Sequence, residues 1–247
     1  MPGIFMTLQG ALQASLLLAA TIPMTWPGLP WESEPASSNP DQLTIALKYV
    51  VYADDTGRTV ITPDDAKQVV SGVNRAFAAC NVRFRVDEYV VARPGDVGLA
   101  YRPTSMKDLN PIRNSFKAER ELVLIHTGPW DPSKGLGADG ANAWTMMPGE
   151  RTAGAVIEAR VAKNPGLVAH ELGHYLGLRH LKERANLMNP VIYTASRKLD
   201  DEQCSVVRAT AASERSYALR MREAAPSGNS RAPATQAAGQ TTSDPGA

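Results

Sequence analysis

The chain has little of what marks several other classes of protein. It holds two cysteines in 247 residues, Cys80 and Cys204, and no C-x-x-C pair, so its cysteines predict no metal site. Its formal net charge is +1, so no overall charge points to a nucleic-acid partner. Its apolar run at residues 11–22 is too short to span a bilayer. The remaining class is a protein with one globular domain and tails. Hydrophobic residues make up 43% of the chain, which is enough for this domain to bury a sizeable core.

The two ends of the chain differ in composition from its middle. The run at 11–22 has the length of a signal-peptide core, so residues 1–22 are a possible signal peptide, and we expect a secreted or periplasmic protein. An apolar N-terminus without a targeting role is the alternative. Five prolines predict an extended linker over residues 23–42, and the composition of residues 223–247 predicts a disordered tail. The folded domain is expected over residues 43–222.

Apolar patterns within this domain predict alternating strands and helices. The expected helices begin at Thr62 and Asp200, where a capping side chain precedes the helix, and the second is expected to run to about Met221. The stretch 87–120 gives little signal and is treated as a loop. The expected strands are residues 43–52, 82–86, 121–126 and 154–159.

Two residue types outside the main motif have more than one interpretation. Cys80 follows the first predicted helix and Cys204 lies in the last. In an exported protein they form either a disulfide or two free thiols. His126, at the end of a predicted strand, is interpreted as a hydrogen-bonded structural histidine and not as a metal ligand.

Residues 170–180 place three histidines and a glutamate at spacings that suit a metal. On a helix of 3.6 residues per turn, His170 and His174 lie on one face, so both imidazoles can reach one ion. Gly177 can adopt the left-handed conformation that ends a helix, and His180 can then return to the ion from another side. Three neutral nitrogens leave one coordination position open, as in catalytic zinc sites.

Glu171 lies between the first two histidines and points to the side of the metal-binding face. It is poorly placed as a ligand but close enough to take a proton from a bound water. A chance match to His-Glu-x-x-His-x-x-Gly-x-x-His in a chain this long has a probability on the order of one in a hundred thousand. The motif therefore predicts a hydrolytic site with Zn2+ as its cofactor.

This motif resembles the signature of the metzincin zinc endopeptidases, in which a methionine turn follows beneath the metal. Residues 186–190, Asn-Leu-Met-Asn-Pro, are similar to that turn. By this resemblance Glu171 is the general base and acid, Met188 is the floor of the site, and zinc is held by His170, His174 and His180. The implied fold is α+β, with a twisted, mixed five-stranded sheet, an antiparallel edge strand, a zinc helix and a C-terminal helix.

Two branch markers are absent from the sequence. No Tyr stands two residues after Met188, where astacins and serralysins carry an extra ligand, and no Pro-Arg-Cys-Gly segment precedes the domain. The pattern is most similar to pappalysin-like or matrixin-like members.

The resemblance also implies how substrate binds. Residues 128–150 are the expected rim of a cleft, whose short edge strand pairs with an extended polypeptide. An ordinary Gly-rich surface loop is the alternative. Residues after the methionine turn are expected to line the pocket for the side chain that follows the cut. The predicted substrate-binding residues are Ala141, Asn142, Ala143, Trp144, Pro190 and Tyr193.

The sequence thus predicts a monomeric zinc-dependent endopeptidase with no nucleic-acid partner and no stable membrane span. Two alternatives stay open: a zinc hydrolase of small or cell-wall-like amides, and a non-enzymatic zinc-bearing binding module. Glu171 argues against the module, because a protein that needed only the fold could lose its base. A long open groove would favour polypeptides, whereas a closed pocket would favour small amides.

Overall fold

The structure is a computed structural model that describes residues 39–118, 121–131, 133, 135–136, 141–146 and 153–213. The possible signal peptide (1–22), the linker (23–42) apart from its last four residues, and the tail (223–247) lie outside the described residues. None of the helices in the described part of the chain combines the length and the apolar character needed to cross a membrane.

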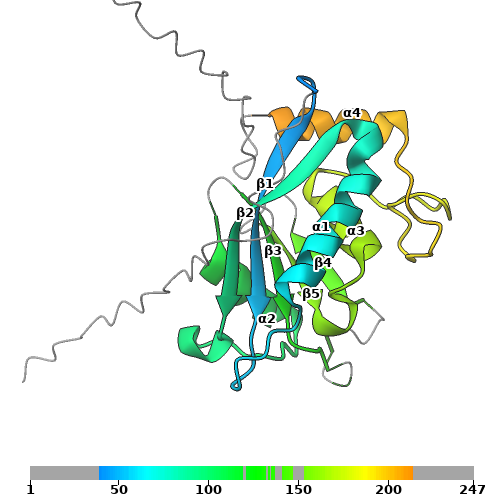
Figure 1. The fold of residues 1–247 in the computed structure, drawn as a ribbon. Helices are drawn as coiled ribbons and strands as arrows, with labels where there is room; N and C mark the ends of the chain where they lie inside the picture. The colour runs from blue at the N-terminus through cyan, green and yellow to red at the C-terminus, as the bar shows by residue number, and fades with distance from the viewer. Residues whose placement is uncertain are drawn as a thin grey trace, which may run out of the picture.

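The centre of the fold is a five-stranded sheet with the strand order β2-β1-β3-β5-β4 (Figure 1). Four strands run parallel, and β4 pairs antiparallel with β5 at the edge. The predicted α+β fold with a mixed sheet and an antiparallel edge strand is therefore confirmed. The strands are β1 Leu43–Tyr52, β2 Val82–Ala92, β3 Leu122–Thr127, β4 Ala143–Met146 and β5 Gly154–Glu158.

Helices cover both faces of the sheet (Figure 1). On one face lies α2 (Met106–Phe116), which packs against Val50 and Tyr52 of β1. Side chains alternate along a strand, so Tyr49 and Val51 point to the other face. The elements on that face are α1 Pro63–Phe77, α3 Pro165–Tyr175 and α4 Asp201–Ala212.

The helix α2 lies within the stretch 87–120, so the prediction of a loop there was wrong. It begins with a capping box, in which Ser105 and Asp108 each accept a hydrogen bond from the other's backbone N–H. Pro111 lies inside the helix, and because proline has no N–H and usually ends a helix, it obscures the helical pattern. The apolar side chains that α2 buries are Leu109, Ile112 and Phe116.

The helix α1 supports the beginning of α3. It starts as predicted, with Thr62 accepting a hydrogen bond from the backbone N–H of Asp65 at 3.2 Å. At Gly72 a Cβ atom would lie 2.4 Å from the Cβ of Pro165. The absence of a side chain at Gly72 therefore lets the two helices approach closely.

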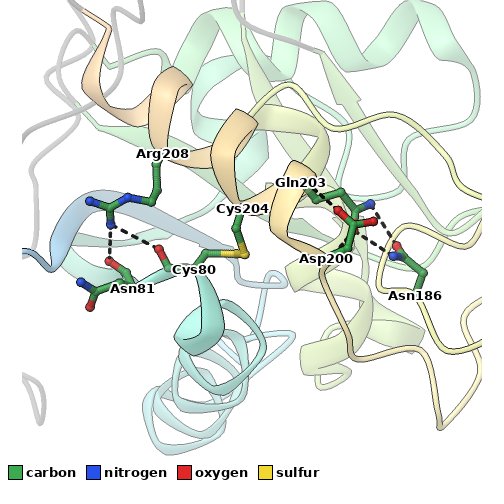
Figure 2. Close-up of a disulfide and its surroundings, with 7 residues drawn as sticks. All are labelled: Cys80, Asn81, Asn186, Asp200, Gln203, Cys204 and Arg208. Carbon is green, nitrogen blue, oxygen red and sulfur yellow. Dashed lines mark hydrogen bonds between the residues drawn. A yellow bond between two sulfur atoms is a disulfide. The ribbon is translucent and has the colours of Figure 1, made fainter.

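The helix α4 is tied to the end of α1 and the start of β2 (Figure 2). Cys80 and Cys204, 124 residues apart, form a disulfide, which settles the two alternatives for these cysteines. Beside it, Arg208 donates to the backbone carbonyls of Cys80 and Asn81, each at 3.3 Å. These contacts hold a helix from the end of the domain against its beginning.

The same helix is shorter than predicted. It ends at Ala212, and Ser213 is extended with φ −76° and ψ 127°, so the prediction of a helix to about Met221 was wrong. The last side chain that α4 buries is Ala211. Because most helical stability comes from packing, the helix ends where its packing ends.

The disulfide generates a prediction about stability. We expect Cys80→Ser, Cys204→Ser and the double variant to lose the same free energy of unfolding, about 4 to 5 kcal/mol in the chain-entropy model. The measurement is denaturant unfolding with and without reductant. Reductant should lower the midpoint of the wild type to that of the variants and leave the variants unchanged. A wild-type midpoint that does not respond to reductant would contradict the prediction.

His126 is fully buried in β3 and stacks on Tyr49, with ring centroids 4.9 Å apart. Neither of its ring nitrogens has a hydrogen-bond partner among the described residues. The interpretation of His126 as a hydrogen-bonded histidine was therefore wrong, although it is a structural residue and lies outside the histidine cluster described below. Burial lowers the pKa of His126 to about 3.

This depressed pKa predicts an acid-sensitive contribution to stability. The folded-state pKa of about 3 lies below the unfolded value of about 6.5, so the unfolded state binds more protons between these limits. Stability should fall as pH drops below about 6.5, by roughly 1.4 kcal/mol per pH unit. His126→Phe keeps the stacked ring and removes this component. Urea unfolding at several pH values should show a weaker acid dependence in the variant, and equal dependence would refute the prediction.

Candidate metal centre

The helix α3 carries the first two histidines of the motif together with the glutamate. Asn164 caps its start and accepts hydrogen bonds from the backbone N–H groups of Gly166 and Leu167, at 3.0 and 3.2 Å. Pro165 occupies the first turn, where a missing N–H costs nothing. The local sequence therefore accounts for the start of this helix.

The same helix ends in a Schellman motif. Gly177 donates to the carbonyl of His174, and Leu178 donates to the carbonyl of Gly173, both at 2.9 Å. Gly177 has a φ of 89°, which residues with a Cβ rarely adopt. This turn reverses the chain and brings His180 back toward the helix.

Three histidine nitrogens meet at this point. Nε2 of His174 lies 3.0 Å from Nε2 of both His170 and His180. The Nε2 atoms of His170 and His180 are 3.2 Å apart. Within the described residues, no other group of three or more His, Cys, Asp or Glu side chains is placed to hold a metal ion.

The hydrogen bonds of the rings show what this cluster can bind. Nδ1 of His170 lies 2.8 Å from the carbonyl oxygen of Leu187, and Nδ1 of His174 lies 2.8 Å from that of Leu178. A carbonyl only accepts, so each Nδ1 carries the proton and each neutral ring presents its Nε2 lone pair to the others. Lone pairs at 3.0 Å repel unless a cation lies between them. A set of imidazole nitrogens with carbonyl-bonded Nδ1 atoms fits a zinc ion.

The surroundings favour the neutral rings that metal binding needs. Burial, together with the neighbouring rings of His174 and His180, lowers the pKa of His170 to about 4. Burial and the charge of His180 also lower the pKa of His174. Both rings are therefore uncharged at neutral pH and are available as ligands.

Glu171 lies beside the cluster and is 5% exposed. Its Oε2 accepts a hydrogen bond from the hydroxyl of Thr145 on β4. Burial raises the pKa of Glu171 to about 7, against the opposing effects of the Thr145 hydrogen bond and the charge of Arg113. A carboxyl group with a pKa near 7 is suited to take and return a proton at neutral pH.

The methionine turn packs directly beneath α3. A Cβ atom at Gly173 would lie 2.5 Å from Sδ of Met188, so the glycine leaves room for the fully buried methionine. Asn186 accepts from the backbone N–H of Met188 at 2.8 Å and exchanges two hydrogen bonds with Gln203 of α4, at 2.8 and 3.1 Å (Figure 2). The helix α4 thereby holds the turn whose Leu187 carbonyl orients a histidine of the cluster.

The edge strand β4 contains two of the four residues of segment 141–144 that were predicted to bind substrate. Ala143 and Trp144 belong to β4, whereas Ala141 and Asn142 precede it. The carbonyl of Asn142 still pairs with β5, accepting from the N–H of Glu158 at 2.9 Å. In the described part of the chain, β4 has a neighbouring strand on one side only.

Two side chains that sequence reasoning missed act on this strand. Thr145 contacts Glu171, and the signal that was available is strand alternation, because Thr145 follows Ala143 by two residues. Arg113 of α2 is buried and donates to the carbonyls of Trp144 and Gly154, at 2.8 and 2.9 Å. No sequence pattern indicates the role of Arg113, because it lies in α2, the helix that was not predicted.

Pro190 and Tyr193 lie in the loop after the methionine turn, and both are exposed. The guanidinium of Arg184 lies 4.7 Å from the centre of the Tyr193 ring. A Cβ at Gly166, in the first turn of α3, would lie 3.8 Å from Ile192, so this loop passes along the helix that carries the cluster. The two predicted residues are therefore accessible to a substrate.

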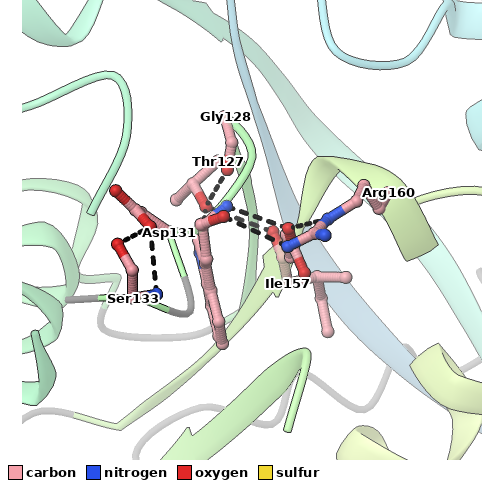
Figure 3. A network of polar contacts seen from close by, with 8 residues as sticks. Thr127, Gly128, Asp131, Ser133, Ile157 and Arg160 are labelled. Carbon is pink, nitrogen blue, oxygen red and sulfur yellow. Dashed lines mark hydrogen bonds and ion pairs between the residues drawn. The ribbon is translucent and has the colours of Figure 1, made fainter. Parts of the chain in front are cut away.

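The start of the predicted rim is anchored to the end of β5 (Figure 3). Buried Glu158 accepts from the backbone N–H of Trp130 at 2.9 Å and forms an ion pair with Arg160. Arg160 also donates to the carbonyl of Trp130 at 3.1 Å, and the indole of Trp130 donates to Thr127 at 2.9 Å. Much of the remaining segment 128–150 lies outside the described residues.

A mixed five-stranded sheet, a helix bearing this motif and a methionine turn beneath it together define a metzincin-type metallopeptidase domain. The sequence profile of the matrixin family matches residues 62–209, more than half of the chain. The chain belongs to the matrixin family of metallopeptidases. The metzincin resemblance is thereby confirmed, with matrixin as the branch that is shown.

One solved structure shares the fold. The crystal structure of metalloproteinase-II from Bacteroides fragilis is similar at a TM-score of 0.50 and 14% sequence identity, over 73% of this chain and 58% of that one. A structure described as a chaperone-substrate complex matches at a TM-score of 0.45 and 14% identity, over 73% of this chain and 36% of that one. This chain thus spans less than two thirds of either protein.

Proposed function

We propose that this protein is a zinc-dependent endopeptidase. The observation that carries the proposal is the convergence of three histidine Nε2 atoms beside a buried glutamate. Next to that glutamate lies the edge of β4 that pairs with no strand of the described part of the chain, and this edge supports a peptide as the substrate.

His170, His174 and His180 would hold the ion, and Met188 would form the floor of the site. When bound, zinc supplies a Lewis acid that polarises a carbonyl and makes water acidic enough to react near neutral pH. The carbonyls of Leu178 and Leu187 keep the first two rings oriented for this role.

Glu171 moves the proton in this proposal. Thr145 occupies its Oε2, which leaves Oε1 to accept a proton from the attacking water. Glu171 then returns this proton to the leaving amine, so that the residue ends in the state in which it began. The buried environment that raises its pKa to about 7 supports both steps at neutral pH.

The edge strand would hold the substrate. Backbone groups of an antiparallel strand point alternately to its two sides, and Asn142 faces β5. The N–H and C=O groups of Ala143 and Thr145 therefore face the side of β4 that no described strand occupies, where an extended peptide can add to the sheet. Apolar side chains at Val191 and Tyr193 favour a hydrophobic substrate residue after the cut.

We also propose a monomer that works in an oxidising compartment. The Cys80–Cys204 disulfide supports the second part, because structural disulfides are rare in reducing cytosol.

The central test is Glu171→Gln. We expect the variant to keep its zinc and fold but to lose peptide hydrolysis by at least about 10²-fold, because the side chain moves a proton and does not bind the metal. Cleavage of a peptide library by the purified protein, with and without chelator, measures this. The matched control is Glu183→Gln, an exposed glutamate on the following loop, which should leave cleavage unchanged.

Near-wild-type turnover in Glu171→Gln would contradict the assigned role. Cleavage of a minimal amide as efficient as that of extended peptides would favour the small-amide hydrolase instead. Bound zinc without hydrolysis of any substrate would favour a binding module.

A further inference from the structure

The side chain of Thr145 reaches the proposed general base from the strand on which the substrate would lie. Ala143 and Thr145 alternate with Trp144 along β4, and Ala143 packs in the core cluster that contains α3. Trp144 packs in the cluster on the α2 side of the sheet. Thr145 therefore points toward α3, where its hydroxyl contacts the carboxylate of Glu171.

The hydroxyl of Thr145 has two partners within reach. One is Oε2 of Glu171, and the other is the backbone carbonyl of the same residue, at 3.3 Å from the hydroxyl oxygen. A hydroxyl donates one hydrogen bond and accepts others. It can donate to the ionised carboxylate, or accept from the protonated carboxyl group while donating to the carbonyl. One contact thus keeps the Glu171 side chain in place before and after proton transfer.

The position of this hydroxyl is itself fixed. Arg113 donates to the carbonyls of Trp144 on β4 and Gly154 on β5, and these two hydrogen bonds tie the strands together beside Thr145. The backbone groups of Thr145 face the edge of β4 that pairs with no strand among the described residues, so Thr145 would contact both a bound peptide and the base.

We propose that Thr145 is a positioning residue, which orients the carboxylate of Glu171 for proton transfer from the substrate-binding strand. This inference rests on the proposed peptidase function, because it assigns a role to Thr145 only in that reaction. The role belongs to the hydroxyl group of Thr145 and not to the packing of its side chain, and separate substitutions can remove each of these.

The experiment uses two pairs of variants that differ in the hydroxyl group. Thr145→Val replaces the hydroxyl with a methyl group of similar size, and Thr145→Ala differs from Thr145→Ser by the hydroxyl alone. We expect kcat for an extended peptide to fall about 10-fold from wild type to Thr145→Val and from Thr145→Ser to Thr145→Ala. KM should change little within each pair, because the hydroxyl acts on the base and the backbone binds the peptide. Zinc content and circular dichroism confirm that each variant is loaded and folded.

A structural role would give the opposite order. If the β-branched shape of Thr145 were what mattered, Thr145→Val would keep its activity and Thr145→Ser would lose it, and this result overturns the proposal. Equal kcat within both pairs overturns it as well. The second pair decides the question if Thr145→Val does not fold.

A double-mutant cycle separates this inference from the proposed function. In a Glu171→Asp background the shortened carboxylate no longer reaches Thr145, so Thr145→Val should cause no further loss. An equal loss in both backgrounds would show that Thr145 does not act through Glu171. If the wild-type protein shows no chelator-sensitive cleavage, both the proposed function and the inference about Thr145 are overturned. If the wild type is active and Glu171→Gln is inactive, the proposed function stands, and the Thr145 variants then decide whether Thr145 positions Glu171.

Discussion

Each of the three metal-capable histidines turns an Nε2 atom toward the same point, and these atoms lie 3.0 to 3.2 Å apart. In His170 and His174, whose Nδ1 atoms donate to carbonyls, the facing Nε2 lone pairs repel one another. A cation at their centre converts that repulsion into binding. Folding must therefore hold the rings together until the ion arrives, and much of the described structure contributes to this.

The carbonyls that orient the rings lie in two separate turns. Leu178 is placed by the left-handed turn at Gly177. Leu187 is placed by the methionine turn, which Asn186 joins to Gln203 of α4. The disulfide in turn holds α4 against the beginning of the domain. Residues far apart in the sequence thus determine the orientation of one imidazole.

Sequence reasoning succeeded where short-range rules decide the structure. Helical periodicity and the conformation of Gly177 predicted that the three histidines meet, and alternation predicted most of the sheet. It missed α2 because Pro111 interrupts its pattern. It missed the contact of Thr145 with Glu171 because alternation gives the face of the strand on which Thr145 lies, but not the residue of another element, 26 positions away, that it meets there. It extended α4 too far because the end of its packing surface is a tertiary property.

X-ray absorption at the zinc edge on the purified protein tests the central claim most directly. The account predicts one zinc per chain, bound by three imidazole nitrogens at about 2.0 to 2.1 Å with one further light-atom ligand. Substitution of His180 by Ala should remove one nitrogen from this shell or abolish binding. Protein that retains no zinc, or a zinc shell without imidazole nitrogens, would contradict the account.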